Sequence, residues 1–284
     1  AVRKYMNEKQ VPQLFIASGA SKWNDPKNYP WTMGWQPSYQ DEARVYAKYI
    51  MKHKPDAKVA VLYQNDDFGK DYLKGLKDAF GGKASMIVAE EAYETSEPTI
   101  DNHIVKLKAA SVDLLYDAST PKFAAQAIRK VADLDWHPVH ILDINASPVS
   151  ATLKPAGLDI SKGIISTNYG KDPADPQWKD DPDVIALKTF MKDYFPDGNL
   201  QDQLIVYGYV VAEATVQVLK QCGDDLTHEN IMKQAANLDI ALPMFLPGIK
   251  VKTSPTDYFP VEAMRLQKFN GETWQLFGDT IGND

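Results

Sequence analysis

The chain has 284 residues, of which 44% are hydrophobic and 24% charged, a composition that excludes disordered and collagen-like proteins. The formal net charge of −7 argues against a protein that coats nucleic-acid phosphates. The single cysteine, Cys222, excludes an intrachain disulfide and a cysteine-based metal cluster. A domain usually has roughly 100–200 residues, so we expect two lobes or one large domain.

The first residues read as the later part of a helix, and a strand is predicted at residues 11–16. They contain no basic segment followed by an apolar run and a small-residue cleavage site, so we expect no signal peptide in this sequence. Because the pattern starts in mid-helix, we also expect that an upstream segment is missing.

Residues 58–168 alternate short apolar runs with amphipathic stretches. Strands are predicted at residues 58–63, 86–89, 112–117, 139–143 and 163–167. Helices with an apolar stripe are predicted at residues 72–80, 100–110 and 121–134. Strand–helix–strand units at this spacing predict an α/β fold with a parallel sheet and helices on both faces.

The pattern of the sequence changes after Thr167. A proline- and aspartate-rich loop at residues 171–183 precedes helices predicted at 184–194, 204–222 and 227–238, the last with Thr227 as its N-cap. The C-terminal part reads as a hairpin, in which Asn270 and Gly271 join strands at residues 263–269 and 272–277.

Motifs for catalysis or cofactor binding are missing from the sequence. There is no G-x-G-x-x-G, no G-x-x-x-x-G-K and no G-x-S-x-G. The kinase-like triplet at residues 67–69 lacks the glycine-rich and His-Arg-Asp loops of kinases. His137 and His140 flank a strand without a third metal ligand nearby. We therefore expect no enzyme activity, no cofactor and no metal.

Polar loops follow several predicted strands, at the edge where open α/β sheets bind ligands. The loop after residues 14–16 is the most distinctive, because its small residues leave backbone N–H groups accessible and its serines add hydroxyls. Such a loop can hold a carboxylate without a countercharge. The other strand-end loops lie at residues 64–69, 117–120 and 143–145.

The order of these elements resembles type I periplasmic binding proteins of ABC importers, in the leucine/isoleucine/valine-binding branch. The segments that carry the resemblance span essentially the whole chain and lie at residues 11–21, 31–37, 58–63, 67–70 and 207–209. It implies two α/β lobes joined by three crossings, with a ligand clamped between them.

Mapped onto this chain, the resemblance places lobe 1 at residues 1–34 and 168–247 and lobe 2 at residues 35–167 and 248–284. The family normally begins with three further strand–helix units, so the N-terminal part of lobe 1 is expected to be absent. Without those strands, lobe 1 is expected to expose a sheet edge and to fold poorly alone.

The resemblance also implies ligand contacts. In lobe 1 the small loop would bind the ligand carboxylate, and in lobe 2 an aromatic side chain would cover the ligand. The matching residues here are Ser18, Gly19, Ala20 and Ser21 for the loop and Phe68 for the aromatic.

Two further positions depart from the pattern of amino-acid binders. Ser119 stands where an aromatic is usual, and Asn145 stands where an acidic residue pairs with the ligand ammonium. A desolvated ammonium needs a charged partner, which a neutral amide does not supply. Asp143, two residues earlier, is the alternative source of that charge.

The sequence thus predicts a monomeric periplasmic solute-binding protein that delivers a small carboxylate to the membrane permease subunits of an ABC importer. The ligand favoured is an aromatic or phenolic acid, since the resemblance is close to binders of lignin-type phenolic acids. A branched-chain amino acid is the alternative ligand. A ligand-sensing domain of a receptor or transcription regulator is the alternative class, and nucleic acid is not expected as a partner of this chain.

Overall fold

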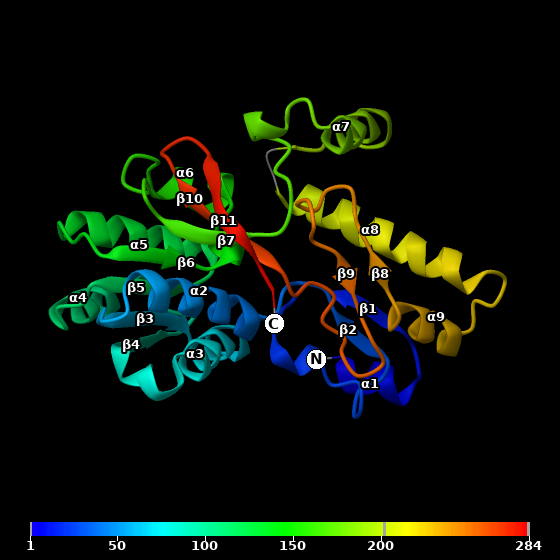
Figure 1. The fold of residues 1–284 in the computed structure, drawn as a ribbon, viewed down its shortest axis with the longest axis horizontal. Coiled ribbons are helices and arrows are strands. Elements are labelled where there is room, and N and C mark those ends of the chain that lie inside the picture. The colour runs from blue at the N-terminus through cyan, green and yellow to red at the C-terminus, as the bar shows by residue number, and fades with distance from the viewer. Residues whose placement is uncertain (1, 201–202, 283–284) are drawn as a thin grey trace. The chain divides into compact units, whose positions relative to one another are not determined.

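The computed structural model describes residues 2–200 and 203–282, which form two compact units (Figure 1). Unit 1 holds the residues up to Ser38 together with Tyr169–Ala263, and unit 2 holds Tyr39–Asn168 and Met264–Gly282. The chain therefore passes from one unit to the other after Ser38, after Asn168 and after Ala263. Among these described residues, no helix is long and apolar enough to cross a bilayer.

Unit 2 is built on a seven-stranded sheet of order β11-β10-β7-β6-β5-β3-β4. The five strands from β7 to β4 are parallel, and β10 and β11 add an antiparallel hairpin at one edge. Their bounds are β3 Val59–Gln64, β4 Ile87–Tyr93, β5 Leu114–Ala118, β6 Val139–Leu142, β7 Ile165–Asn168, β10 Met264–Phe269 and β11 Trp274–Ile281.

Helices cover both faces of this sheet (Figure 1). On β5, Leu115 packs with residues of α4 (Asp101–Ala109) and α5 (Pro121–Asp133), while its neighbour Tyr116 contacts Tyr46 of α2 and Tyr72 of α3. Successive strand residues point to opposite faces, so α4 and α5 lie on one side and α2 (Tyr39–His53) and α3 (Asp67–Phe80) on the other. Short helical segments complete the unit: η2 Gly81–Met86, η3 Ile144–Ala146, η4 Val149–Leu153 and α6 Lys154–Ala156.

Unit 1 contains two small sheets and several helices. The strands β1 (Gln13–Ile16) and β2 (Thr32–Gly34) pair in parallel, and β8 (Asp239–Ile240) pairs antiparallel with β9 (Val251–Lys252). Its helices are α1 Arg3–Glu8, η1 Ser21–Trp23, η5 Pro176–Trp178, α7 Pro182–Tyr194, α8 Gln203–Cys222 and α9 His228–Ala235. The Asn7 amide ties α1 to the second strand, since it donates to Thr32 Oγ1 at 2.7 Å and accepts from Trp31 N at 2.9 Å.

The α/β fold with a parallel sheet covered on both faces is as the sequence predicts. Thr227 caps α9 as expected, accepting a hydrogen bond from Asn230 N. Several elements were not expected, notably α2, β2, β8 and β9. The hairpin connection is longer than the predicted Asn-Gly turn, because Asn270 Oδ1 accepts from Glu272 N and Thr273 N and the next strand starts only at Trp274.

The unit boundaries differ from the expected lobes at residues 248–263. This segment was assigned to lobe 2 but belongs to unit 1. Its strand β9 pairs with β8, and Tyr258 N donates to Asn24 Oδ1 at 2.6 Å, so its hydrogen bonds attach it to unit 1. The first passage also falls later than expected, after Ser38 rather than after residue 34.

Candidate functional site

The loop of unit 1 predicted to hold a carboxylate runs from the end of β1 into η1. Gly19 and Ala20 are buried, Ser18 is half-buried, and Ser21, the first residue of η1, is exposed. The Ser18 hydroxyl accepts a hydrogen bond from Ala20 N at 3.2 Å, which tightens the loop. The hydroxyl of Ser21 thus lies at the solvent side of a compact, small-residue loop.

Two features of the backbone hold this loop in place. A Cβ at Gly34 on β2 would lie 3.1 Å from the Ser18 carbonyl oxygen and 3.1 Å from Trp23 Cβ, so glycine permits the close approach of strand and loop. Phe15, just before the loop, has a φ of 55°, a left-handed conformation that is rare for a bulky residue. Its ring packs edge-on against Trp35 with centroids 5.0 Å apart, and this contact helps to hold the strained backbone.

The predicted residues of unit 2 follow three adjacent strands. Phe68 comes after β3, Ser119 after β5, and Asp143 and Asn145 after β6, and these strands are neighbours in the sheet. Because the three strands are parallel, their carboxyl ends meet at one edge. The fold therefore brings the unit 2 candidates to the same edge of one sheet.

Phe68 lies in the first turn of α3. Asp66 caps this helix by accepting hydrogen bonds from Phe68 N at 3.0 Å and Gly69 N at 3.3 Å. A Cβ at Gly69 would lie 2.1 Å from the Gln64 carbonyl oxygen, so only glycine lets the helix start directly against the end of β3. The Phe68 ring is half-buried and packs edge-on against Tyr39 and Tyr72, with centroids 5.0 and 5.1 Å apart.

Ser119 is fully buried and faces the interior of unit 2. Its hydroxyl donates to Asp117 Oδ1, and the other oxygen of Asp117 lies 3.3 Å from His140 Nε2. The proton of Ser119 is therefore already engaged within the unit. His140 thus pairs with Asp117, while the exposed His137 pairs with Asp135. Within the described residues, no group of His, Cys, Asp and Glu side chains is arranged to hold a metal ion.

Asp143 and Asn145 have different roles after β6. The strand ends at Leu142, so the alternation of a strand does not extend to these residues. Asp143 is fully buried and caps η3, with its Oδ1 accepting from Asn145 N at 2.9 Å and from Asn145 Nδ2 at 3.1 Å. Asn145 itself is half-buried. In unit 2 the neutral amide is thus nearer to solvent than the acid.

A buried carboxyl, Glu42 of α2, organises this edge and was not anticipated from the sequence. Its Oε1 accepts from Tyr46 OH at 2.6 Å, Ile144 N at 2.7 Å and Thr167 Oγ1 at 3.1 Å. Its Oε2 accepts from Tyr72 OH at 2.5 Å. The signal in the sequence was the spacing of Glu42 and Tyr46, four residues apart on one helix face.

Burial sets the protonation of these acids. Removal from water raises the pKa of Glu42, against the opposing effect of its four hydrogen bonds. Burial also raises the pKa of Asp143 well above its ordinary range, and the nearby carboxyls of Glu42 and Asp117 raise it further. One oxygen of Asp143, Oδ2, is buried without a hydrogen-bond partner among the described residues. Of these two side chains, Asp143 is therefore the acid whose charged form this edge disfavours most, because four hydrogen bonds stabilise the carboxylate of Glu42.

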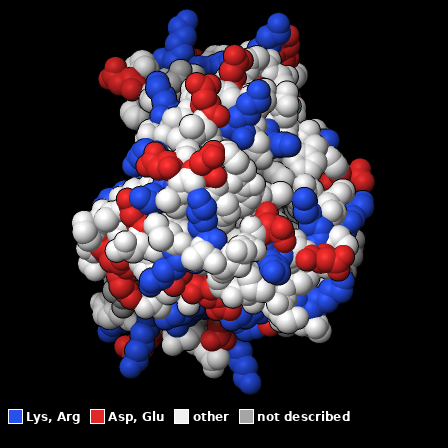
Figure 2. All heavy atoms as spheres, turned by 90° about the vertical axis from the view of Figure 1, so that its left-hand side faces the viewer, with Lys and Arg blue, Asp and Glu red and all other residues white. Residues whose placement is uncertain are grey.

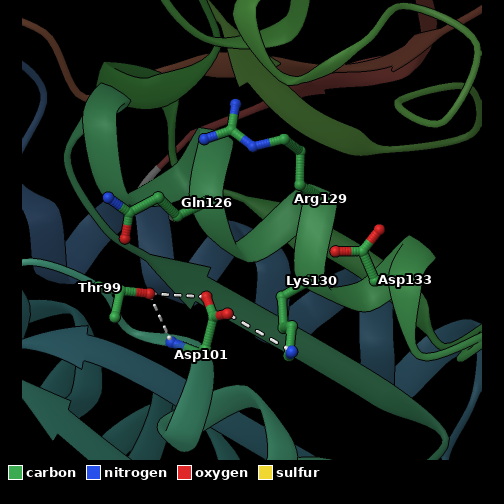
Figure 3. A pocket seen from close by; sticks show the side chains of 6 residues that line it. All are labelled: Thr99, Asp101, Gln126, Arg129, Lys130 and Asp133. Carbon is green, nitrogen blue, oxygen red and sulfur yellow. Dashed lines mark hydrogen bonds and ion pairs between the residues drawn. The ribbon is translucent and has the colours of Figure 1, made fainter.

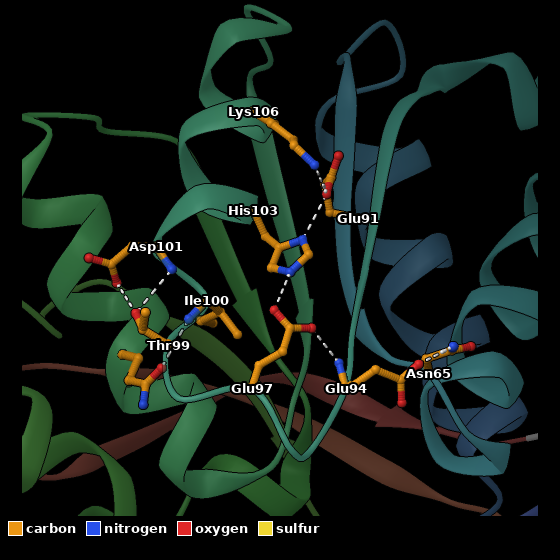
Figure 4. A network of polar contacts seen from close by, with 10 residues as sticks. Asn65, Glu91, Glu94, Glu97, Thr99, Ile100, Asp101, His103 and Lys106 are labelled. Atoms are coloured by element: carbon orange, nitrogen blue, oxygen red, sulfur yellow. Dashed lines mark hydrogen bonds and ion pairs between the residues drawn. The ribbon is translucent and has the colours of Figure 1, made fainter.

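A separate polar network joins β4 to α4 (Figure 4). His103 lies between two carboxylates, with its Nδ1 2.7 Å from Glu91 Oε2 and its Nε2 2.9 Å from Glu97 Oε2. Burial opposes protonation of this ring, but the hydrogen bonds to Glu97 and Glu91 outweigh it and raise the pKa of His103. Lys106 also reaches Glu91, at 3.1 Å.

A surface hollow of about 290 Å³ lies at α5 and the start of α4 (Figure 3). Its lining carries charges of both signs, and Asp101 and Lys130 form an ion pair at 3.4 Å. Its lining residues are Thr99, Asp101, Gln126, Arg129, Lys130 and Asp133, none of which belongs to the predicted site. The face shown in Figure 2 likewise intersperses basic and acidic side chains.

Comparison with protein-family models assigns the chain to a known class. A model described as periplasmic binding protein matches residues 1–273. A curated relative, the Leu/Ile/Val-binding protein homolog 1 of Brucella abortus (strain 2308), is 25% identical over 185 residues, which are 65% of this chain and 47% of the relative. The chain thus spans about half the length of the curated relatives it matches.

Solved structures share the fold. A branched chain amino acid ABC transporter from Thermus thermophilus with bound valine matches with a TM-score of 0.85 and 16% identity over 99% of this chain and 75% of that one. A substrate-binding periplasmic protein from Ralstonia solanacearum matches with a TM-score of 0.77 and 20% identity over 98% of this chain and 74% of that one.

These matches, together with the strand order of unit 2, define a periplasmic binding protein with the type I fold. The chain belongs to the periplasmic binding protein family, and the curated relatives that it resembles are named as Leu/Ile/Val-binding protein homologues.

Proposed function

We propose that this protein is a periplasmic solute-binding protein that captures a small organic acid and delivers it to the permease of an ABC importer. The family assignment supports the solute-binding role, and the titles of similar solved structures supply the link to ABC transport. In this proposal the protein binds its ligand without chemical change.

The ligand contacts are proposed for both units. The loop of Ser18, Gly19, Ala20 and Ser21 binds the carboxylate through hydrogen bonds, and Phe68 covers the apolar part of the ligand. The buried Ser119 and Asp143 act through their neighbours, since their side chains are engaged inside unit 2.

One observation favours an aromatic or other non-amino acid as ligand. At the end of β6 the half-buried side chain is the neutral Asn145, while Asp143 is buried beneath it as a helix cap. A desolvated ammonium without a facing carboxylate is strongly unfavourable, whereas a phenolic hydroxyl needs only a hydrogen bond.

A branched-chain amino acid is the second candidate ligand. It is favoured by the valine bound in the Thermus thermophilus structure and by the name of the Brucella relatives. A sensor domain is the alternative class for the same fold, in which ligand binding is coupled to a receptor or regulator instead of an importer.

A thermal-shift screen of the complete protein against benzoate-type acids, cinnamate-type acids and branched-chain amino acids tests the proposal. A ligand at about 100 times its Kd adds about 2.7 kcal/mol to the free energy of unfolding, which gives a clear shift. Stabilisation by leucine or valine above that by aromatic acids would contradict the ligand class but not solute binding. No stabilisation by any acid would contradict the solute-binding proposal itself.

A further inference from the structure

The orientation of the Asn145 amide is fixed by two acceptors inside unit 2. Asn145 Nδ2 lies 3.0 Å from the Tyr72 hydroxyl oxygen and 3.1 Å from Asp143 Oδ1. If the amide were turned around, its carbonyl oxygen would face these two atoms instead. The direction therefore depends on whether Tyr72 and Asp143 accept or donate at this point.

Tyr72 accepts from Asn145 because its only proton is used elsewhere. The hydroxyl lies 2.5 Å from Glu42 Oε2 and donates to that carboxyl. The other oxygen of Glu42 already accepts from Tyr46, Thr167 and the backbone N–H of Ile144. Toward Asn145, Tyr72 thus presents only a lone pair.

Asp143 Oδ1 is also an acceptor, whatever the protonation state of the acid. It receives the backbone N–H of Asn145 at 2.9 Å. A proton on this carboxyl would sit on the unpartnered Oδ2 and would leave Oδ1 as a carbonyl oxygen. Both N–H bonds of the Asn145 amide are therefore consumed inside unit 2, by Tyr72 and Asp143.

What remains is the side-chain carbonyl oxygen of Asn145. Among the described residues this Oδ1 has no hydrogen-bond partner, and it is not among the buried unpaired atoms, so it reaches solvent. Building on the proposed function, we propose that Asn145 presents this fixed acceptor to the ligand, so that the protein selects organic acids that carry a hydrogen-bond donor, such as a hydroxyl group, over analogues with an acceptor there.

The chemical consequence is a preference for ligands that place a hydrogen-bond donor, and not an acceptor, next to Asn145. A ligand hydroxyl can donate to Oδ1, whereas a keto, ether or second carboxylate oxygen would place lone pair against lone pair. An unpaired acceptor in a closed polar site weakens binding by roughly 10-fold or more. Because the Tyr72 hydroxyl donates its proton to Glu42, it can only accept a hydrogen bond from Asn145. Tyr72 is therefore a positioning residue that acts on the ligand only through Asn145.

Matched ligand pairs and one hydroxyl deletion test this inference. Calorimetry on the complete protein compares 4-hydroxybenzoate with 4-fluorobenzoate, 4-hydroxycinnamate with 4-fluorocinnamate, and 2-hydroxy-4-methylpentanoate with its 2-keto analogue. We expect the donor-bearing member of each pair that binds to bind roughly 10-fold or more tightly. In Tyr72→Phe the amide is free to turn, and the preference should fall to less than about 3-fold.

Tyr93→Phe is the matched control. It removes the hydroxyl of another fully buried tyrosine of unit 2, whose hydrogen bonds among the described residues are with Gln64 and Thr120 rather than with Asn145. The donor preference should persist in this variant. If the donor preference were lost in both variants, the cause would be a general destabilisation of unit 2 by removal of a buried hydroxyl, and the inference would be overturned.

A measurement without ligand tests the orientation itself. By NMR, the side-chain amide protons of Asn145 should exchange slowly with water in the wild type and in Tyr93→Phe, and rapidly in Tyr72→Phe. Rapid exchange in the wild type, or a bound acid whose acceptor analogue binds equally well, would overturn the inference while leaving solute binding intact. If slow exchange is found but no acid binds, the proposed function fails instead, and the ligand preference falls with it.

Discussion

Asp143 combines full burial with an oxygen that has no hydrogen-bond partner among the described residues. Its pKa is raised well above the ordinary range by burial and by Glu42 and Asp117. An acid whose pKa is higher in the folded than in the unfolded state binds its proton more tightly when folded. Its stabilising contribution is therefore present below the ordinary pKa and is lost as pH rises through the raised value.

Replacing this acid with its neutral isostere should remove part of that pH dependence. We expect Asp143→Asn to raise the free energy of unfolding at about pH 8 more than at about pH 5, because the charged form is then absent. Urea denaturation at both pH values measures the difference. The exposed Asp56→Asn serves as control, and an equal effect of Asp143→Asn at both pH values would contradict the expectation.

Ser21 is the most exposed of the four loop residues assigned to the carboxylate. If its hydroxyl donates to the ligand, Ser21→Ala should weaken binding by about 1.5–3 kcal/mol, the usual range for a hydrogen bond to a charged group. Calorimetry with the tightest ligand of the screen gives the value. The exposed Ser85→Ala in unit 2 should leave affinity unchanged, and an unchanged affinity for Ser21→Ala would remove this residue from the site.

At the scale of elements, α3 depends on a glycine at its start. A Cβ at position 69 would overlap the backbone of Gln64, at 2.1 Å from its oxygen and 2.6 Å from its nitrogen. Because backbone cannot move aside like a flexible side chain, Gly69→Ala should destabilise the protein by about 1–3 kcal/mol or more. It should also displace Phe68 and weaken ligand binding.

The matched control for this change is Gly82→Ala in η2. A Cβ there meets no atom within 4 Å. Its effect on the free energy of unfolding should therefore be small or favourable. Equal stability of the two variants in urea denaturation would show that the close packing of α3 on β3 is wrong.

The edge strand β4 is joined to α4 by a titratable group. His103 faces Glu91 of β4 and Glu97 of the following loop, with Lys106 on its own helix nearby (Figure 4). Since its pKa is raised in the fold, its stabilising contribution is present below the ordinary value and is lost as pH rises through the raised one. Its effect is local, because these contacts lie at one edge of the sheet.

Hydrogen exchange over β4 and α4 checks this dependence. After correction for intrinsic rates, protection should fall between about pH 5.5 and about pH 8.5, the range in which histidine loses its proton. The fall should be absent in His103→Gln and present in His137→Gln, since His137 is exposed and its ion pair within the described part of the chain is with the neighbouring Asp135. The same fall in His103→Gln would rule out this histidine as its cause.

The elements that could be predicted from the sequence are those with a clear pattern of apolar residues or a clear helix-capping residue. The parallel strands of unit 2 are apolar runs, and Thr227 marks the start of α9 directly. Helix α2 was missed because its buried face includes Asp41 and Glu42, which interrupt the apolar stripe. Strands β8 and β9 have two residues each, too few to show alternation, so no local pattern indicated that residues 248–263 belong with unit 1.

The candidate site was predictable only in part, for a related reason. Polar residues after apolar runs indicate strand ends, and this located Phe68, Ser119 and Asn145 at one edge of the sheet. The hydrogen-bond network of Glu42 could not be predicted in this way. Its partner Thr167 lies 125 residues away in the chain, and such a contact leaves no local pattern.

At the scale of the whole molecule, each unit has a reporter of its own. Cys222 is the only cysteine of the chain, and it is buried in unit 1. Burial raises the pKa of its thiol, so it reacts slowly with alkylating reagents until unit 1 opens. The amides of β3 and β5, in the core of unit 2, report the opening of that unit by hydrogen exchange.

A ligand that contacts both units should slow both reporters. We expect a saturating ligand from the screen to reduce Cys222 alkylation in mild urea and also to slow exchange in β3 and β5. An acid that contributes nothing to binding serves as control at the same concentration. Protection of one unit alone would contradict a ligand held by residues of both.

The left-handed backbone of Phe15 has a consequence for how the sequence can change. Glycine at this position would relieve about 1–2 kcal/mol of backbone strain but would remove the ring that packs on Trp35 beside the loop proposed to bind the carboxylate. Position 15 is therefore under two opposing demands, one from the backbone and one from the side chain. Libraries selected for folding yield and libraries selected for ligand capture should accumulate different residues there, so this single codon can separate the two pressures.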